Sequence, residues 1–299
     1  MRYLLAIVLS VCSILVNAQS EYDYADSIAL SHAGKKFKNT GELAQTLTHG
    51  VKDRKTQFRI LFRWITDNME YEMGNRINDP EKVIRKMEGM CGAYSKLLSQ
   101  ACAHVGIHCV TIEGIAKGHT TVGSVSEGSA HRHAWNAVEI DGEWHLVDPC
   151  WASGYWDEKE KEFTKVFKPE YFYSDPFIFA ERHLPDDKKW QLLDHPRNKR
   201  DFFSTPLYHA IKYDCGIEMV NEKNAVIKVK EDEDIIIKYS SACQDEDDPS
   251  GALDDPRKKY EYEQQFKAQR YLDNPYLTVM FNGEPLVSYK VEVKPVADK

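Results

Sequence analysis

One stretch of the chain, Met-Cys-Gly-Ala-Tyr at residues 90–94, decides how the rest of the sequence is interpreted. Two further stretches follow it: His-Arg-His-Ala-Trp-Asn at 131–136 and His-Leu-Val-Asp-Pro-Cys-Trp at 145–151. After Cys91, apolar residues recur at helical spacing as far as Val105. The pattern therefore predicts a helix whose first residue is the cysteine.

The residues on either side of this helix predict a mixed fold. Residues 39–72 have the apolar spacing of helices, whereas residues 107–117, 133–140 and 143–148 have the alternation of strands. Asp141-Gly142, between the last two strands, is typical of a two-residue hairpin turn. Helices followed by antiparallel strands indicate an α+β domain.

Its predicted position gives Cys91 the surroundings of a reactive thiol. A thiol attacks as the thiolate, and the aligned dipoles and unbonded N–H groups of a helix N-terminus favour negative charge. The same N–H groups can hold the oxyanion that forms when a carbonyl is attacked. Gly92 leaves room for a substrate backbone to approach. Cys91 is therefore the candidate nucleophile.

A thiol nucleophile needs a base, and the base needs a group that orients it. His133 and Asp148 lie on the two arms of the predicted hairpin, so antiparallel pairing brings them near one another. A carboxylate that holds one imidazole nitrogen leaves the other for the thiol. His131 lies on the same strand face and competes with His133 as the base.

The residues alone leave two other interpretations open. Each of the three residues could be structural: a buried cysteine beside an incidental histidine–aspartate pair. A metal site from His131, His133 and Cys91 is also conceivable, although it lacks a clear further ligand. The favoured thiol chemistry requires no metal and no cofactor.

Taken together, the motifs resemble the transglutaminase-like superfamily. The resemblance covers about residues 40–195 and rests on the segments 62–71, 89–94, 133–136 and 144–149. Three later segments resemble the branch that contains the kyphoscoliosis peptidase: Tyr-Ser-Asp-Pro at 173–176, His-Leu-Pro at 183–185 and Trp-Gln-Leu-Leu at 190–193.

This resemblance implies a papain-like α+β core in which Cys91 is the nucleophile, His133 the base and Asp148 the residue that orients the base. It favours His133 over His131, because the family's histidine precedes Ala-Trp-Asn. The family includes proteases, amidases, transamidases and inactive members. The motifs therefore identify a nucleophile and leave the substrate open.

The function expected is that of an exported thiol hydrolase, a protease or amidase that acts on amide bonds of a protein or peptide substrate. Gly92, Trp135 and Trp151 are expected to contact the substrate, although packing is an equal interpretation for the two tryptophans. A protein-glutamine transamidase is the alternative enzyme. The alternative from a different class is a binding or scaffold module that uses the same fold without turnover.

The first residues predict where the protein acts. Residues 1–18 read as a secretory signal peptide, with Arg2 before an apolar run and Val-Asn-Ala at a small-residue cleavage site. Export to the periplasm or the extracellular space is expected, with no membrane span in the mature chain. The net charge of −8 argues against nucleic acid or an anionic membrane as the main partner.

The composition shifts near residue 200, which predicts a catalytic domain over 19–199 and a C-terminal β-sandwich over 200–299. Asn282-Gly283 is a further hairpin turn within the predicted sandwich. Because export favours paired cysteines, Cys215 and Cys243 in this region are expected to form a disulfide. The acidic run at 244–251 is interpreted as a solvated loop rather than a calcium loop.

Overall fold

The computed structural model describes residues 22–117, 131–157, 162–209, 211–244 and 259–295. The predicted signal peptide, the predicted loop 118–130 and most of the acidic run lie outside the described residues.

The chain divides into two compact units. The first unit comprises residues 1–113 and 133–174, and the second comprises residues 114–132 and 175–299. This division follows contacts rather than composition, and the expected domain boundary at residue 200 stays a prediction.

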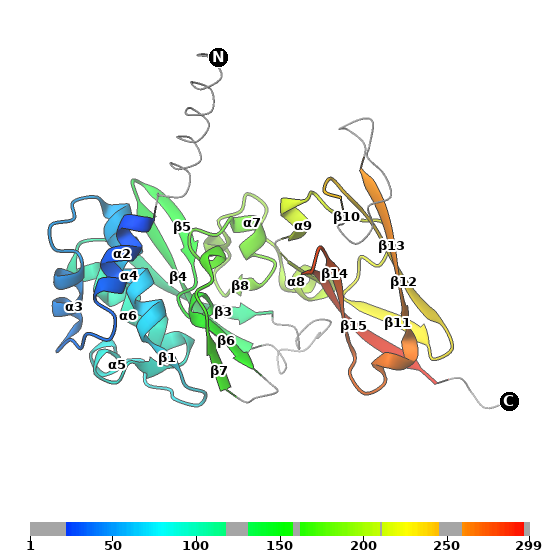
Figure 1. The fold of residues 1–299 in the computed structure, drawn as a ribbon, viewed down its shortest axis with the longest axis horizontal. Coiled ribbons are helices and arrows are strands. Elements are labelled where there is room, and N and C mark those ends of the chain that lie inside the picture. Colours follow the sequence, from blue (N-terminus) through cyan, green and yellow to red (C-terminus); the bar gives the residue numbers. More distant parts are fainter. Residues whose placement is uncertain (1–21, 118–130, 158–161, 210, 245–258, 296–299) are drawn as a thin grey trace, which may run out of the picture. The chain divides into compact units, whose positions relative to one another are not determined.

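The first unit has mixed helix and strand content, as the sequence predicts (Figure 1). Its helices are α2 (Asp23–Ser31), α3 (Thr40–Leu47), α4 (Arg54–Asn68), α5 (Pro80–Lys86) and α6 (Cys91–His104). Its strands are β1 (Glu70–Tyr71), β2 (Glu88–Gly89), most of β3 (His108–Ala116), most of β4 (His131–Ile140), β5 (Glu143–Val147), β6 (Gly154–Asp157) and β7 (Glu162–Lys165).

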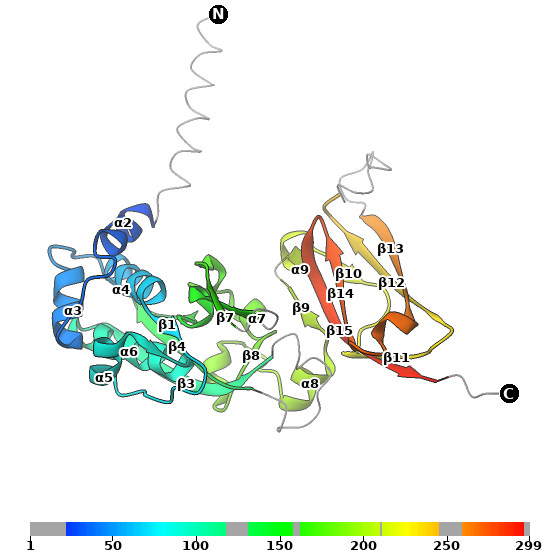
Figure 2. The same cartoon turned by 60° about the horizontal axis from the view of Figure 1, so that its bottom comes forward.

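The hairpin that carries the predicted base forms as expected. β4 pairs with β5 in antiparallel register, with Asn136 opposite Val147. Asp141 and Gly142 between the strands both have positive φ, 53° and 84°. A two-residue turn of this kind matches the right-handed twist of the strands. The sheet order is β5-β4-β3-β8, and Figure 2 shows α6 beside β3 and β4.

Local packing explains why α6 begins at Cys91. β1 and β2 form a short parallel pair in which Tyr71 lies opposite Gly89. Gly89 has φ of 156°, and a Cβ atom there would lie 2.5 Å from the Cβ of Ala93. Met90 is extended and supplies no side-chain cap, so the helix starts at the next residue. Gly89 thus ends the β2 strand directly against the first turn of α6.

A single apolar core ties the helices of the first unit to the sheet. It is lined by buried residues of the helices and by residues from one face of β4 and β5, among them Val138, Ile140 and Val147. The catalytic candidates therefore project from elements that a continuous core holds in place.

The second unit is rich in strands. Its helices are α7 (Pro176–Phe179), α8 (Lys199–Ser204) and α9 (Ile211–Asp214). Its strands are β8 (His183–Pro185), β9 (Leu207–Tyr208), β10 (Glu218–Met219), β11 (Val226–Lys230), β12 (Asp234–Ser241), β13 (Tyr260–Lys267), β14 (Tyr276–Phe281) and β15 (Glu284–Lys294).

Two sheets of the second unit share one apolar cluster. One has the order β10-β12-β13, and the other has the order β11-β15-β14 with β9 beside β15. Both contribute buried residues to the same cluster, for example Ile237 and Val279. Asn282 and Gly283 form the predicted turn between β14 and β15. The expected disulfide between Cys215 and Cys243 is confirmed.

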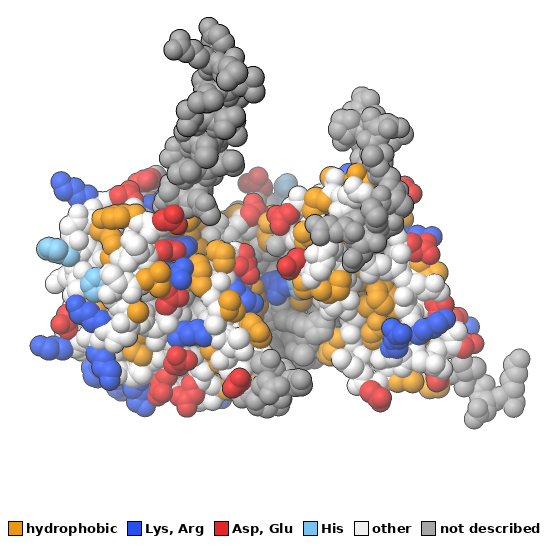
Figure 3. Space-filling model, in the orientation of Figure 1, with side chains coloured by type: hydrophobic (Ala, Val, Ile, Leu, Met, Phe, Trp, Pro, Cys, Tyr) orange, Lys and Arg blue, Asp and Glu red, His pale blue; other side chains and the backbone are white. Residues whose placement is uncertain are grey.

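The described surface is mixed in charge. On the face drawn in Figure 3, acidic and basic side chains are interspersed over the coloured residues. Among the described residues, no helix has both the length and the apolar character needed to cross a membrane.

Candidate active site

Cys91 is the first residue of α6 and is partly exposed. The first two residues of a helix cannot donate their N–H groups within it, which applies here to Cys91 and Gly92. The described helical hydrogen bonds begin with the N–H groups of Ala93 and Tyr94, which donate to the carbonyl of Met90. The thiol therefore lies beside N–H groups that can stabilise negative charge.

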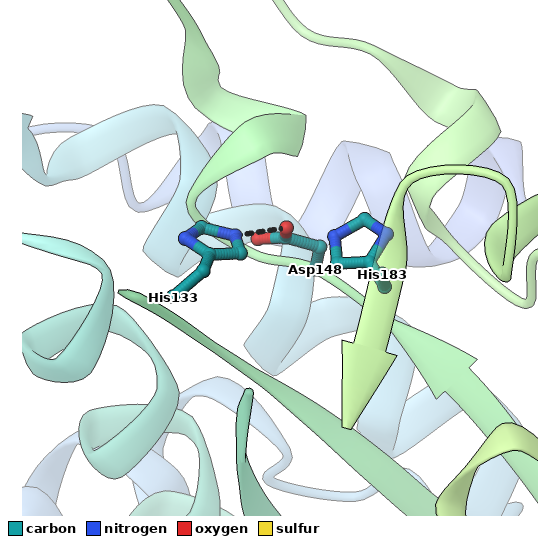
Figure 4. Close-up of side chains that lie close together, drawn as sticks. All are labelled: His133, Asp148 and His183. Carbon is teal, nitrogen blue, oxygen red and sulfur yellow. Dashed lines mark hydrogen bonds and ion pairs between the residues drawn. The ribbon is translucent and has the colours of Figure 1, made fainter. Parts of the chain in front are cut away.

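His133 and Asp148 come together as the hairpin predicts. The Nε2 atom of His133 lies 2.6 Å from Oδ2 of Asp148, and both side chains are buried (Figure 4). Because Asn136 pairs with Val147, Asp148 is the diagonal neighbour of His133 on the strand face that they share. The other ring nitrogen, Nδ1, is thus left for the thiol.

The carboxylate of Asp148 is fully used. Its Oδ1 atom accepts hydrogen bonds from the backbone N–H of Cys150 at 3.0 Å and of Trp151 at 2.9 Å. Its own N–H donates to the carbonyl of Tyr171. These bonds fix the carboxylate before any substrate arrives, so it can hold the imidazole in one orientation.

The electrostatics favour an ion pair between the thiol and the imidazole. Burial disfavours the Cys91 thiolate, but the hydrogen bond and charge of His133 and the N–H of Ala134 outweigh it and lower the pKa of Cys91. Burial likewise works against the His133 cation. The charge and hydrogen bond of Asp148, aided by Cys91, nevertheless raise the pKa of His133 to about 10.

The expected substrate-contacting residues differ in exposure. Trp151 is partly buried and stacks on His133, with ring centroids 4.8 Å apart. Trp135 is fully buried, with its ring centroid 6.0 Å from that of His133, so it packs beneath the base. A Cβ atom at Gly92 would meet only the Cβ of Asn78, at 4.0 Å. Space is therefore present beside the nucleophile.

The alternative base and the metal alternative are not built by the described side chains. The side chain of His131 lies outside the described residues, so the metal alternative through His131 stays untested. His183, also labelled in Figure 4, belongs to the second unit, where its ring stacks on Phe179.

Some residues around the site received no role from the sequence. Asn136, inside the quoted motif, is fully buried and donates to α6 and β3. Near the nucleophile, Tyr71 of β1 packs against Phe163 of β7, with ring centroids 5.5 Å apart. Lys165 of β7 pairs with Glu70 of β1 at 3.0 Å. Of these, only Asn136 carried a usable signal, because the motif includes it.

Comparison with known proteins agrees with the motifs. Residues 41–149 match the family model of the transglutaminase-like superfamily. The kyphoscoliosis peptidase of Mus musculus is 31% identical over 193 residues, which cover 62% of this chain and 29% of that protein. Hillarin of Drosophila melanogaster is 26% identical over 227 residues, which cover 71% of this chain and 28% of that protein.

A candidate cysteine protease from Cytophaga hutchinsonii is a similar solved structure, at 18% identity and a TM-score of 0.32 over 50% of this chain and 43% of that one. The chain spans less than a third of the length of the curated relatives that it matches. The family model and the kyphoscoliosis peptidases together show that the chain belongs to the transglutaminase-like superfamily, in the branch of those peptidases.

Proposed function

We propose that this protein is an exported thiol hydrolase that cleaves amide bonds, with Cys91 as nucleophile, His133 as base and Asp148 as the residue that orients the base. The observation that carries the proposal is the buried bond between His133 and Asp148 beside a thiol of lowered pKa. The motif thus supports an enzyme over a binding module that lacks turnover.

In the first half of the reaction, the thiolate of Cys91 attacks the carbonyl carbon of the amide. A C–S bond forms, and the carbonyl oxygen becomes an oxyanion that the N–H groups at the start of α6 can stabilise. The imidazolium of His133 then gives its proton to the leaving nitrogen. The C–N bond breaks, an amine departs, and a thioester remains on Cys91.

In the second half, water replaces the amine. Neutral His133 accepts a proton from the water as its oxygen attacks the thioester. The C–S bond breaks, the carboxylic acid leaves, and the thiolate–imidazolium pair is restored. Asp148 keeps its charge throughout and holds the imidazole through the bond to Nε2.

Hydrolysis is favoured over transfer to an amine because water is abundant. The name of the mouse and human relatives, kyphoscoliosis peptidase, supports a peptide bond as the substrate. A protein-glutamine transamidase would use the same thioester and differ only in the acceptor. An incubation with a labelled primary amine separates the two, since only a transamidase incorporates the label.

The second unit supports the remaining parts of the proposal. Its disulfide between Cys215 and Cys243 is of the kind that persists in oxidising compartments, which favours export. Its two sheets around one apolar cluster support a C-terminal β-sandwich, which we propose positions the substrate or binds a partner.

The test is the rate at which iodoacetamide alkylates Cys91 between pH 5 and pH 10, read by peptide mass mapping. An ordinary thiol has a pKa of about 8.5 and reacts slowly at pH 6. Cys91 should still react fast at pH 6, and the His133→Ala variant should shift the profile to higher pH. Comparison of peptides cleaved by wild type but not by Cys91→Ala then identifies the substrate.

Cys102 is the internal control, because it is buried in the middle of α6 and burial raises its pKa. An ordinary profile for Cys91 in wild type, unmoved by His133→Ala, would overturn the catalytic assignment in favour of the binding module.

A further inference from the structure

Asn136 lies three residues after His133 on β4, and none of its side chain is exposed. Its Nδ2 atom donates to three acceptors: the carbonyl of Ser95 at 3.0 Å, Oγ of Ser99 at 2.9 Å and the carbonyl of Val110 at 3.1 Å. One amide group therefore joins β4 to α6 and to β3.

The orientation of this amide is fixed by its partners. Two of the three acceptors are carbonyl oxygens, which cannot donate, so the NH₂ end must face them. The other end, Oδ1, is buried and has no partner among the described residues. A buried acceptor without a partner costs about 1–3 kcal/mol. An apolar side chain would avoid this cost, so stability alone does not account for an asparagine here.

The acceptors lead directly to the nucleophile. The hydroxyl of Ser95, one helical turn after Cys91, donates to the carbonyl of Cys91 at 3.0 Å. The carbonyl of the same Ser95 accepts from Asn136. A continuous series of hydrogen bonds thus connects the residue that carries the thiol to the strand that carries the base.

A second branch of the network secures the same contact from β3. The hydroxyl of Ser99 lies 3.1 Å from that of Thr111, and Ser99 also lies next to Cys109. A shift of α6 along β4 by a fraction of a turn would break the bonds to Asn136 and Thr111 together. The network therefore specifies one register of the helix against the sheet.

We propose that Asn136 is a positioning residue that fixes the register of α6 against β4 and thereby sets the distance between the thiol of Cys91 and the ring of His133. The inference rests on the proposed function, because it concerns the pairing of those two groups. Asn136 itself does not touch the reacting atoms.

The test compares Asn136→Ala with Val138→Ala, a substitution on the same strand and the same face that removes packing but no hydrogen bond. Both variants should lower stability. Only Asn136→Ala should lengthen the thiol–imidazole contact and so raise the pKa of Cys91. A rise of about one pKa unit reduces alkylation at pH 6 about tenfold relative to the rate at high pH.

Ser99→Ala is the milder variant should Asn136→Ala not fold. It removes one of the three acceptors and should move the alkylation profile in the same direction by a smaller amount. The profile is measured well below each variant's unfolding midpoint, so that unfolded protein does not contribute.

The outcomes separate the two proposals. An acid-shifted wild-type profile that His133→Ala abolishes, together with an unchanged profile in Asn136→Ala and Ser99→Ala, would overturn the positioning role and leave the proposed function intact. Equal shifts in Asn136→Ala and Val138→Ala would reduce Asn136 to a packing residue. An ordinary profile in wild type would overturn both.

Discussion

His133 in the first unit and Lys117 in the second are both buried bases, yet their pKa values move in opposite directions. Burial works against the charged form of each. Asp148 outweighs it for His133 and raises the pKa to about 10. Lys117 has no carboxylate within bonding distance among the described residues, and burial lowers its pKa to about 7 despite the nearby charge of Glu181.

The partners of Lys117 explain the difference. Its Nζ atom donates to the carbonyl of Phe202 at 2.7 Å and, at longer distances, to the carbonyls of Thr205 and Pro206 and the hydroxyl of Thr205. These groups follow or end α8, so the ammonium caps carbonyls that the helix leaves unbonded. Neutral oxygens compensate less of the lost hydration than a carboxylate does.

Burial by itself therefore does not mark a reactive group. Lys117 is enclosed by backbone acceptors and has no exposed atom, which is the pattern of a structural contact. His133 has a carboxylate on one nitrogen and a partly exposed thiol beside the other, which is the pattern of a proton carrier. The predictions below test this contrast, from the largest expected effect to the smallest.

Asp148→Asn should have the largest effect. It keeps the size of the side chain but removes the charge that offsets the burial of His133, so the imidazolium is lost and the tautomer is no longer fixed. Turnover of the identified substrate should fall on the order of 10⁴-fold. Alkylation of Cys91 should change less than turnover does.

The matched control is Asp141→Asn in the turn of the same hairpin. Asp141 has positive φ, which asparagine also tolerates, so this variant should keep its turnover. Retention of more than a tenth of the activity by Asp148→Asn would contradict the role of the carboxylate.

Removal of the disulfide should affect the second unit alone. The double variant Cys215→Ala with Cys243→Ala opens a link between residues 28 apart in sequence. Its stability in urea should fall by about 2–4 kcal/mol, and wild type under reducing conditions should match it. The alkylation profile of Cys91 should not change, and a shifted profile would show that the contrast between the units is too simple.

Lys117→Met should change how stability depends on pH. The folded pKa of Lys117 is about 7 and its ordinary value is 10.5, so the unfolded chain binds more protons between these values. The contribution of Lys117 to stability therefore rises with pH through this window. The difference in unfolding free energy between wild type and Lys117→Met should grow from pH 7 to pH 10.

Urea unfolding at pH 7, 8.5 and 10 measures this difference, with the exposed Lys228→Met as the control that should show no such trend. A difference that shrinks as the pH rises would mean that Lys117 keeps its proton in the folded protein, as His133 does.

Trp151→Phe should have the smallest effect. The indole lies over His133 and stabilises its cation, a contact worth about 0.5–1 kcal/mol. A phenyl ring retains part of it, so the pKa of His133 should fall by less than about one unit. An NMR titration of His133 measures the shift. Trp144→Phe, whose indole packs edge-on against His108, is the control that should leave it unchanged.

The sequence by itself determined the local structure that carries the site. Gly89 ends β2, so α6 begins at Cys91, and Gly106 has the left-handed conformation that ends the helix. Asp141-Gly142 forms the hairpin that brings His133 to Asp148. Each of these follows from backbone preferences or from pairing within a few residues, which the order of amino acids specifies directly.

Tertiary structure decided what depends on partners distant in sequence. Nothing in the motif indicated that Asn136 bonds to Ser95, or that Lys117 caps the carbonyls after α8. Whether Trp135 or Trp151 is exposed was equally open from the residues. Burial and the identity of a hydrogen-bond partner arise only when separate segments pack, and a pKa responds to both. The sequence therefore named the ionisable groups of this protein, and the packing set their charge.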